Sequence, residues 1–410
     1  MTDQNPTHCQ GWDFFFAPWS RAPVGWEFKR VVPRLIERDR KFRHGPRRMS
    51  PVPFIAHPGF ATLALPRHVA LLAGLALFSG IVVRTMISVG VPDRPDARKA
   101  HTRVTPKSGG VGIVAAFLLG ISLLYRFGEV SRLAAPLFVG VIAAAVLIAA
   151  VSLLDDLFDF PFLVKLGAQF LAALVAVGAG LSARKFDLPL LGAVPLGMAG
   201  PVLSLIWILF VTNAMNFIDG LDGLAAGTTL IACLFLAGIA GLHGGFFVYT
   251  TALLLAGGVA GFLPFNYPRA RIFMGDVGSQ FCGFMLAVLG IAATHYQRVS
   301  LSFLVVPLLL SGVLLDVTFT LVRRTVAGQN IARAHRGHLY QVAHRAGMDA
   351  RWVAIIYWGF AIFGGVVVIG FLHAPTDWKP VVIFAPLLPF AMWAAYVVRR
   401  AGRAEIGPWG

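Results

Sequence analysis

The sequence is poor in charged residues and in cysteine. Charged side chains make up 13% of the 410 residues, about half of the roughly 25% that is usual in soluble domains. The three cysteines, Cys9, Cys233 and Cys282, are scattered, and neither a zinc-site spacing nor a Gly-x-x-x-x-Gly-Lys phosphate loop occurs. These absences exclude a soluble enzyme, a disulfide framework and a zinc protein. With 57% hydrophobic residues, the composition indicates a membrane protein.

Long apolar segments dominate the rest of the chain. About eleven of them approach the ~20 residues that a helix needs to cross a bilayer. We therefore expect an all-α polytopic membrane protein with a catalytic domain at 67–400 and a cytoplasmic tail at 401–410. Residues 1–66 contain no such segment, so we expect either a poorly structured extension or a translation start near Met49. The expected spans are 68–91, 110–126, 133–154, 162–181, 200–217, 224–242, 247–264, 279–294, 301–321, 352–372 and 380–398.

Basic residues are concentrated in alternate connections. The loops 92–109, 265–278 and 322–351 and the end of the chain are rich in Lys and Arg, so these connections should be cytoplasmic. The formal net charge of +16 then reflects topology together with anionic head groups or phosphates. No motif points to nucleic acid, and no internal repeat supports a transporter built from inverted repeats.

A polar stretch at 213–223 separates two apolar segments of the chain. It contains Asn213, Asn216, Asp219 and Asp222, which are costly in a membrane unless they face water or a polar site. The first three follow the i, i+3 spacing of one helical face. Such a face offers carboxamide and carboxylate oxygens to Mg²⁺ with a phosphate attached. A helix cap plus a glycine turn would explain one Asn and one Asp, but not all four.

Acidic residues also stand at two other segment ends. Asp155 and Asp156 are adjacent at the end of an apolar segment, where they repel each other unless a cation neutralises them. Asp159 fits an ordinary cap. Lys165 either reaches a phosphate or extends to the membrane surface. Asp276 lies between two glycines before another apolar segment, where it is either a metal ligand or an N-cap.

Two basic stretches complete the set. The stretch at 93–110 contains Lys99, His101 and a glycine pair, which suits an anion. The stretch at 329–345 is dense in His and Arg, and Arg can bind a diphosphate in a bidentate manner. Each stretch alone is equally well explained as a basic loop that sets topology. In the second stretch, the candidate ligands are His335, Arg336 and His338.

In their order, these five stretches resemble the polyprenyl-phosphate N-acetylhexosamine-1-phosphate transferases, glycosyltransferase family 4. The resemblance covers residues 68–350 and is strongest at Asn-Ala-Met-Asn-Phe-Ile-Asp-Gly-Leu-Asp-Gly (213–223) and Met-Gly-Asp-Val-Gly-Ser (274–279). The loop His-Arg-Gly-His-Leu-Tyr-Gln (335–341) lacks the triple His of the peptidoglycan enzymes. It looks closest to the O-antigen-type initiating enzymes, which leaves the sugar undecided.

The resemblance implies roles for these residues. Mg²⁺, with Mn²⁺ as an alternative, would be held by Asn216 and Asp276. Asp155 and Asp156 would serve catalysis or the lipid phosphate. The substrates would be undecaprenyl phosphate and a UDP-N-acetylhexosamine, at a cytoplasmic site of a bacterial inner membrane protein surrounded by lipids, with a homodimer left open. Substrate-binding residues would be Lys99, His101, Lys165, Asn213, Asp219, Asp222, His335, Arg336 and His338.

The expected reaction is attack of a lipid phosphate oxygen on the β-phosphorus of the UDP-sugar, which releases UMP. Direct attack is preferred over a two-step route with an aspartyl nucleophile. Two alternatives stay open at this point. One is the phospho-N-acetylmuramoyl-pentapeptide transferase of peptidoglycan synthesis. The other is a non-enzymatic anion transporter, although its polar residues should line a whole path rather than gather on one side.

Overall fold

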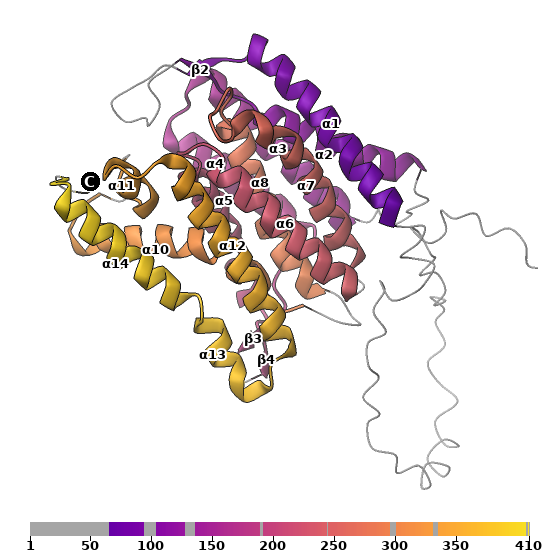
Figure 1. Ribbon diagram of the computed structural model, residues 1–410. Helices are drawn as coiled ribbons and strands as arrows, with labels where there is room; N and C mark the ends of the chain where they lie inside the picture. The colour runs from indigo at the N-terminus through magenta and orange to yellow at the C-terminus, as the bar shows by residue number, and fades with distance from the viewer. Residues whose placement is uncertain are drawn as a thin grey trace, which may run out of the picture.

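The computed structural model describes residues 65–93, 104–127, 136–188, 192–243, 245–295, 301–330, 335–406 and 409, and these residues are mostly helical (Figure 1). Apolar segments form helices in a membrane because lipid offers no hydrogen-bond partners. Every backbone N–H and C=O group must therefore be satisfied within the segment. The longer helices are α1 (Leu65–Val89), α2 (Gly110–Phe127), α3 (Pro136–Phe158), α4 (Phe162–Gly178), α5 (Ala199–Ile218), α6 (Leu224–Leu242), α7 (Phe246–Asn266), α8 (Gly275–Ala292), α10 (Ser311–Val326), α12 (Ala350–His373) and α14 (Leu387–Arg403).

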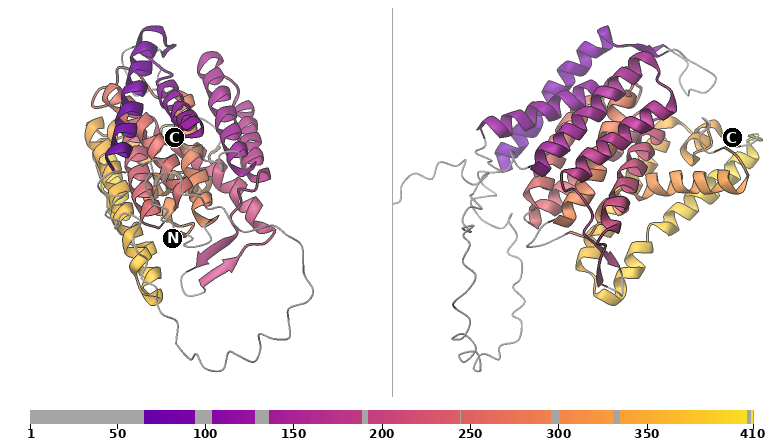
Figure 2. Two further views of the ribbon diagram at one scale, coloured as in Figure 1. Left: turned by 90° about the vertical axis from the view of Figure 1, so that its right-hand side faces the viewer. Right: turned by 180° about the vertical axis from the view of Figure 1, so that it is seen from behind.

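Helix α8 forms the centre of the bundle. It is buried from Val277 to Ala292, and only Gly275 and Asp276 at its start are partly exposed. It packs against α2, α3, α5 and α7. Helices α1 and α14 lie on the outside of the bundle (Figures 1 and 2). Because α8 is enclosed on all sides, the polar residues at its first turn are held between the ends of neighbouring helices.

Among the described residues, eight helices are long and apolar enough to cross a membrane, and two shorter apolar helices accompany them, Gly110–Arg126 and Phe162–Gly178. This confirms the all-α polytopic class, while the number eleven is not confirmed. The expected span 301–321 differs, because it is split at Leu310 into α9 (Val305–Leu309) and α10. Helix α10 runs crosswise to the long helices (Figure 1) and ends in Arg323 and Arg324.

The two ends of the bundle have different short elements. One end carries the strand pair β1 (Pro92–Asp93) and β2 (Thr105–Pro106) and the short helix α11 (Leu339–Arg345). The opposite end carries the hairpin of β3 (Lys185–Leu188) and β4 (Gly192–Pro195) and the helix α13 (Lys379–Phe384) (Figure 1). The structure is completed by η4 (Ala293–His295) and η5 (Thr376–Trp378).

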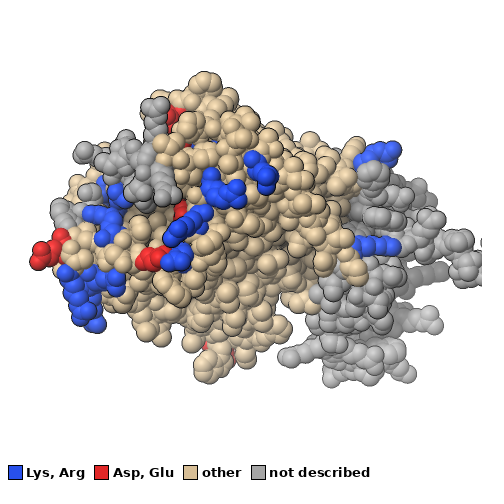
Figure 3. Space-filling model, turned by 45° about the horizontal axis from the view of Figure 1, so that its top comes forward, with Lys and Arg blue, Asp and Glu red and all other residues tan. Residues whose placement is uncertain are grey.

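Charge is uneven on the face seen from the β1–β2 end. Figure 3 shows Lys and Arg gathered with a few acidic side chains on the left part of this face and again at its right margin. A broad uncharged surface lies between them. This arrangement agrees with an apolar, membrane-facing body that carries a charged site at one end.

Candidate active site

The first turn of α8 is fixed by close backbone packing. A Cβ on Gly110 would lie 2.2 Å from the Cα of Gly278, so α2 and α8 cross in direct backbone contact. Gly275 has a φ of +71°, and a Cβ there would lie 2.5 Å from Oδ2 of Asp156. Gly275 therefore lets α3 approach the start of α8, and Gly278 lets α2 approach it.

Both carboxylate oxygens of Asp156 accept hydrogen bonds from the backbone at the start of α8. Its Oδ1 accepts the backbone N–H of Asp276 at 3.1 Å, and its Oδ2 accepts that of Val277 at 3.2 Å. The side chain is buried, at 4% exposure. A carboxylate that satisfies the free N–H groups of a first helical turn acts as a cap from another helix. Of the two roles left open for Asp276, the cap of α8 is thus supplied by Asp156 instead.

Asp155 faces a different partner. Its Oδ2 lies 2.5 Å from Nζ of Lys165, and its Oδ1 accepts the N–H of Phe160 at 2.8 Å. Lys165 also lies 3.2 Å from Oδ2 of Asp276. Of the two alternatives for Lys165, the structure therefore has the ammonium pointing into the site, where it joins two carboxylates.

Asp276 accepts two further hydrogen bonds. Nδ2 of Asn216 donates to its Oδ1 at 3.0 Å, and Nε2 of Gln280 donates to its Oδ2 at 2.9 Å. Asn216 also donates to Oγ of Ser279 at 3.0 Å. The predicted metal pair, Asn216 and Asp276, thus lies in direct contact although 60 residues separate the two. We call Asp155, Lys165, Asn216 and Asp276 the carboxylate cluster.

Asn213 lies one turn deeper than Asn216. Its Nδ2 donates to Oε1 of Gln169 at 2.6 Å and to the carbonyl of Leu209 at 2.8 Å. Gln169 in turn donates to Oε1 of Gln280 at 3.0 Å. This chain of amides ends at Asp276, so Asn213 supports the cluster from behind. Gln280 was not anticipated, because an isolated Gln in an apolar segment gives no motif.

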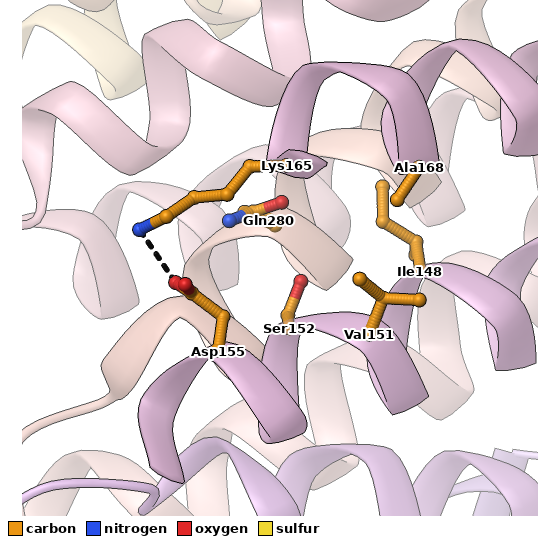
Figure 4. A pocket seen from close by; sticks show the side chains of 7 residues that line it. All are labelled: Ile148, Val151, Ser152, Asp155, Lys165, Ala168 and Gln280. Atoms are coloured by element: carbon orange, nitrogen blue, oxygen red, sulfur yellow. Dashed lines mark ion pairs between the residues drawn. The ribbon is translucent and has the colours of Figure 1, made fainter. Parts of the chain in front are cut away.

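A small pocket lies beside the cluster, between α3, α4 and α8. Figure 4 shows Asp155, Lys165, Gln280 and Ser152 on one side of this pocket, with apolar side chains on the other. Lys165 and Asp155 point toward each other and form an ion pair at one side of this pocket. The pocket thus joins a charged corner to an apolar wall formed by Ile148, Val151 and Ala168.

The turn after α5 places the remaining acids. Oδ2 of Asp222 accepts the N–H of Ala270 at 2.9 Å and so fixes the loop that leads to α8. Asp219 carries its carboxyl near Asp276. Enclosure by protein atoms, and then the negative charge of Asp276, raise the pKa of Asp219 well above its usual range. A bound cation would lower this pKa, so the group favours one.

The His-rich loop lies against the end of α5. The ring of His338 stacks at 5.9 Å on that of Phe217, the neighbour of Asn216, and His335 lies 5.0 Å from His338. Burial, and then the charge of His338, lower the pKa of His335 to about 4, so His335 is neutral at physiological pH. Arg336 belongs to the same loop and is partly buried.

Two predicted ligands, Lys99 and His101, lie outside the described residues. From the same basic stretch, Lys107 is described, and its Nζ lies 3.3 Å from Oδ1 of the exposed Asp159. Two other residues of this end were not anticipated. Asp316 of α10 contacts the His-rich loop and Tyr340 lies within it, and both are almost fully buried. Only a lone acid in an apolar segment could have pointed to Asp316.

The carboxylate cluster fits a hard divalent cation. Among the described residues, no three His, Cys, Asp or Glu side chains are grouped as metal ligands. Mg²⁺ needs fewer, because one or two carboxylates plus waters and substrate phosphates complete its shell. Asp276 offers carboxylate oxygens and Asn216 a carboxamide oxygen. The ammonium of Lys165, placed between Asp155 and Asp276, shows that a positive charge is favoured here.

The fold and the site define a helical membrane protein with paired carboxylates, a carboxamide and a lysine at one end of the bundle and a His/Arg loop beside them. Residues 138–294 match glycosyl transferase family 4. Three curated bacterial relatives have similar sequences over most of their length.

The chain is 32% identical over 324 residues (78% of this chain, 88% of the relative) to a probable undecaprenyl-phosphate N-acetylglucosaminyl 1-phosphate transferase of Bacillus subtilis. It is 34% identical over 335 residues (74% and 81%) to a decaprenyl-phosphate N-acetylglucosaminephosphotransferase of Mycobacterium tuberculosis. It is 32% identical over 253 residues (62% and 72%) to an undecaprenyl-phosphate alpha-N-acetylglucosaminyl 1-phosphate transferase of Thermotoga maritima. The chain belongs to the polyprenyl-phosphate N-acetylhexosamine-1-phosphate transferase family.

Proposed function

We propose that this protein transfers an N-acetylhexosamine-1-phosphate from a UDP-sugar to undecaprenyl phosphate, which yields a lipid diphosphate-sugar and UMP. The observation that carries the proposal is the carboxylate cluster, in which four residues from α3, α4, α5 and α8 meet at one end of an apolar bundle. The names of the relatives support the same reaction class.

The donor is UDP-N-acetylglucosamine in this proposal. The three relatives named above are all N-acetylglucosamine-phosphate transferases by name, and the loop at 335–341 lacks the triple His of the peptidoglycan enzymes. The site faces the cytoplasm of a bacterial plasma membrane, because the loops that surround it are rich in Lys and Arg.

In the reaction, an oxygen of the lipid phosphate forms a bond to the β-phosphorus of the donor. The bond between this phosphorus and the oxygen that bridges to the α-phosphorus breaks, and UMP leaves with the electron pair. Both reactants are anionic, so positive groups must offset their repulsion. Lys165 supplies one such group at the carboxylate cluster, and the His338 loop supplies others. Mg²⁺ held by Asn216 and Asp276 would supply Lewis-acid charge neutralisation when bound.

Asp155 serves by positioning Lys165. One of its oxygens is bonded to the N–H of Phe160 and the other lies on the Lys165 ammonium, so neither is directed as a free nucleophile. This supports direct attack by the lipid phosphate over an aspartyl-phosphate intermediate. Phosphate is largely ionised near neutral pH, and positioning it contributes more than removing its proton.

The lipid tail has an apolar surface beside the cluster. The outward faces of α3 and α4 expose large hydrophobic side chains, among them Leu157 and Leu163 at 47% and 76% exposure. Such exposure is stable in a bilayer but costly in water. The prenyl chain can therefore lie in the membrane while its phosphate meets Lys165.

The test is an assay of the purified protein in detergent with undecaprenyl phosphate, Mg²⁺ and a panel of UDP-sugars that includes UDP-N-acetylmuramoyl-pentapeptide. We expect UMP release with UDP-N-acetylglucosamine and loss of release with EDTA. Release with the pentapeptide donor alone would replace the proposal by the peptidoglycan reaction. A folded protein silent with every donor would contradict the transferase itself.

A further inference from the structure

One buried carboxylate outside the carboxylate cluster organises the His-rich loop. Asp316 on α10 has no exposed surface. Its Oδ1 accepts the N–H of Leu339 at 2.8 Å, and its Oδ2 accepts the N–H of Tyr340 at 3.3 Å. A carboxylate on the first free N–H groups of a helix is favourable both as a hydrogen-bond acceptor and as a negative charge. Asp316 thus fixes where α11 begins.

The same carboxylate also accepts hydrogen bonds from two side-chain hydroxyl groups. Oγ1 of Thr320 donates to its Oδ1 at 3.2 Å, and the hydroxyl of Tyr357 on α12 donates to its Oδ2. A fully buried carboxylate is costly unless such donors surround it. Four donors from α10, α11 and α12 therefore define a single position for this group.

His338 is the residue that this arrangement orients. Its Nδ1 lies 3.6 Å from Oδ1 of Asp316. His338 is also the N-cap of α11, where its side chain accepts the backbone N–H of Gln341. The ring is 4% exposed and lies between the rings of Phe217 and Tyr340. A buried carboxylate beside one imidazole nitrogen fixes the orientation of the ring.

Tyr340 connects this unit to the carboxylate cluster. Its hydroxyl donates to the carbonyl of Phe217 at 2.7 Å, and Phe217 directly follows Asn216. A Cβ on Gly220 would lie 2.3 Å from the same hydroxyl. The start of α11 is therefore hydrogen-bonded both to Asp316 of α10 and to the end of α5. A shift of the hydrogen bonds from α11 to Asp316 would move His338 relative to Asn216.

We propose that Asp316 is a positioning residue for donor binding: it caps α11 and holds the His338 imidazole toward the diphosphate of the sugar nucleotide. This inference rests on the transferase function proposed above. Asp316 does not touch substrate; it acts through His338. The contrasting role is a purely structural one, in which Asp316 only stabilises the junction of α10, α11 and α12.

The kinetic test compares Asp316→Asn with Thr320→Val, which removes a donor to the same carboxylate but leaves the α11 cap intact. Asn keeps the size of the side chain, but its amide places N–H groups against the N–H of Tyr340 or Leu339. We expect Asp316→Asn to raise the KM for UDP-N-acetylglucosamine at least about tenfold, with the KM for the lipid phosphate within about twofold of wild type. Thr320→Val should leave both within about twofold.

A double-mutant cycle separates positioning from stability. If Asp316 acts through His338, the pair Asp316→Asn/His338→Ala should lose no more than about twofold beyond His338→Ala alone. Fully multiplied losses, or equal rises of both KM values, would overturn the proposal. An inactive wild-type protein would instead contradict the transferase function, so the two failures are distinguishable.

Hydrogen–deuterium exchange tests the cap without any turnover. In Asp316→Asn, the amides at 339–341 should exchange faster than in wild type, whereas those of α8 should stay protected. Unchanged exchange at 339–341 would overturn the cap, whatever the activity. Equal acceleration across all helices would show a merely structural role and would overturn the positioning role.

Discussion

The two halves of the site, the carboxylate cluster and the His338 loop, differ in the sign of the charge that their side chains carry. In the carboxylate cluster, Asp155 and Asp276 share the single ammonium of Lys165, so negative charge is in excess and a cation is attracted. Beside the His338 loop, the carboxylate of Asp316 is satisfied by backbone and hydroxyl donors. The loop itself carries His335, Arg336 and His338. We therefore propose that one half holds a cation and the other an anion, as transfer between two phosphates requires.

The largest expected effect tests the cation half. Asp276→Asn removes the charge that Lys165, Asn216 and Gln280 all contact, so UMP release should fall by more than about a hundredfold. The control is Asp349→Asn, an exposed acid at the start of α12 where Asn also caps well. Wild-type turnover in Asp276→Asn, with added Mg²⁺, would refute the role of the cluster.

A second prediction separates the adjacent acids of α3. Asp155→Asn should lower turnover strongly and leave the melting temperature close to wild type, because Lys165 keeps Asp276 as its partner. Asp156→Asn weakens the cap of α8 and should cost about 1 kcal/mol of stability. Turnover and thermal unfolding of both purified variants check this. The reverse pattern would exchange the roles assigned to the two residues.

A third prediction concerns pH and the anion half. Burial, and then the charge of His338, lower the pKa of His335 from 6.5 to about 4. In this window the unfolded chain binds more protons than the folded one, so stability falls as pH falls from 6.5 toward 4. The melting temperature of wild type should therefore decrease more steeply between pH 6.5 and about 5 than that of His335→Asn. If the melting temperatures of wild type and His335→Asn fell in parallel with pH, His335 would not be neutral and buried in the folded protein.

The smallest effect is expected at Asp159. This acid follows Asp155 and Asp156 within one turn, but it is 90% exposed and pairs only with Lys107 among the described residues. Asp159→Asn should stay within about 0.5 kcal/mol of wild type in stability and should keep its turnover. A large loss of UMP release would extend the carboxylate cluster to a residue that the geometry places outside it.

The sequence predicts which residues form the site better than it predicts the role of each residue. The spacing of Asn213, Asn216 and Asp219 and the glycines around Asp276 predict a polar site at helix ends, and the structure brings these residues together. Asp155 and Asp156 could not be told apart, because only the crossing of α3 and α8 decides which one meets a backbone N–H. Asp316 was missed for the same reason, since its backbone partners in α11 follow more than twenty residues later.

The fold shows the same limit. Apolar length predicts most helices within a few residues, as at α6 and α12. It fails at 301–321, where a continuous apolar run is broken at Leu310 and α10 turns crosswise. Hydropathy does not show how a segment packs against its neighbours. Here the crosswise direction of α10 places Asp316 beside the first backbone N–H groups of α11.

The central claim is that the β-phosphorus of the donor passes to the lipid. We would incubate the purified protein with undecaprenyl phosphate, Mg²⁺ and UDP-N-acetylglucosamine labelled with ³²P at the β-position, and then extract the lipid. We expect label in the lipid fraction together with an equal amount of UMP, and neither with Asp276→Asn. Label that stays in the aqueous phase as UDP, or an active Asp276→Asn, would contradict it.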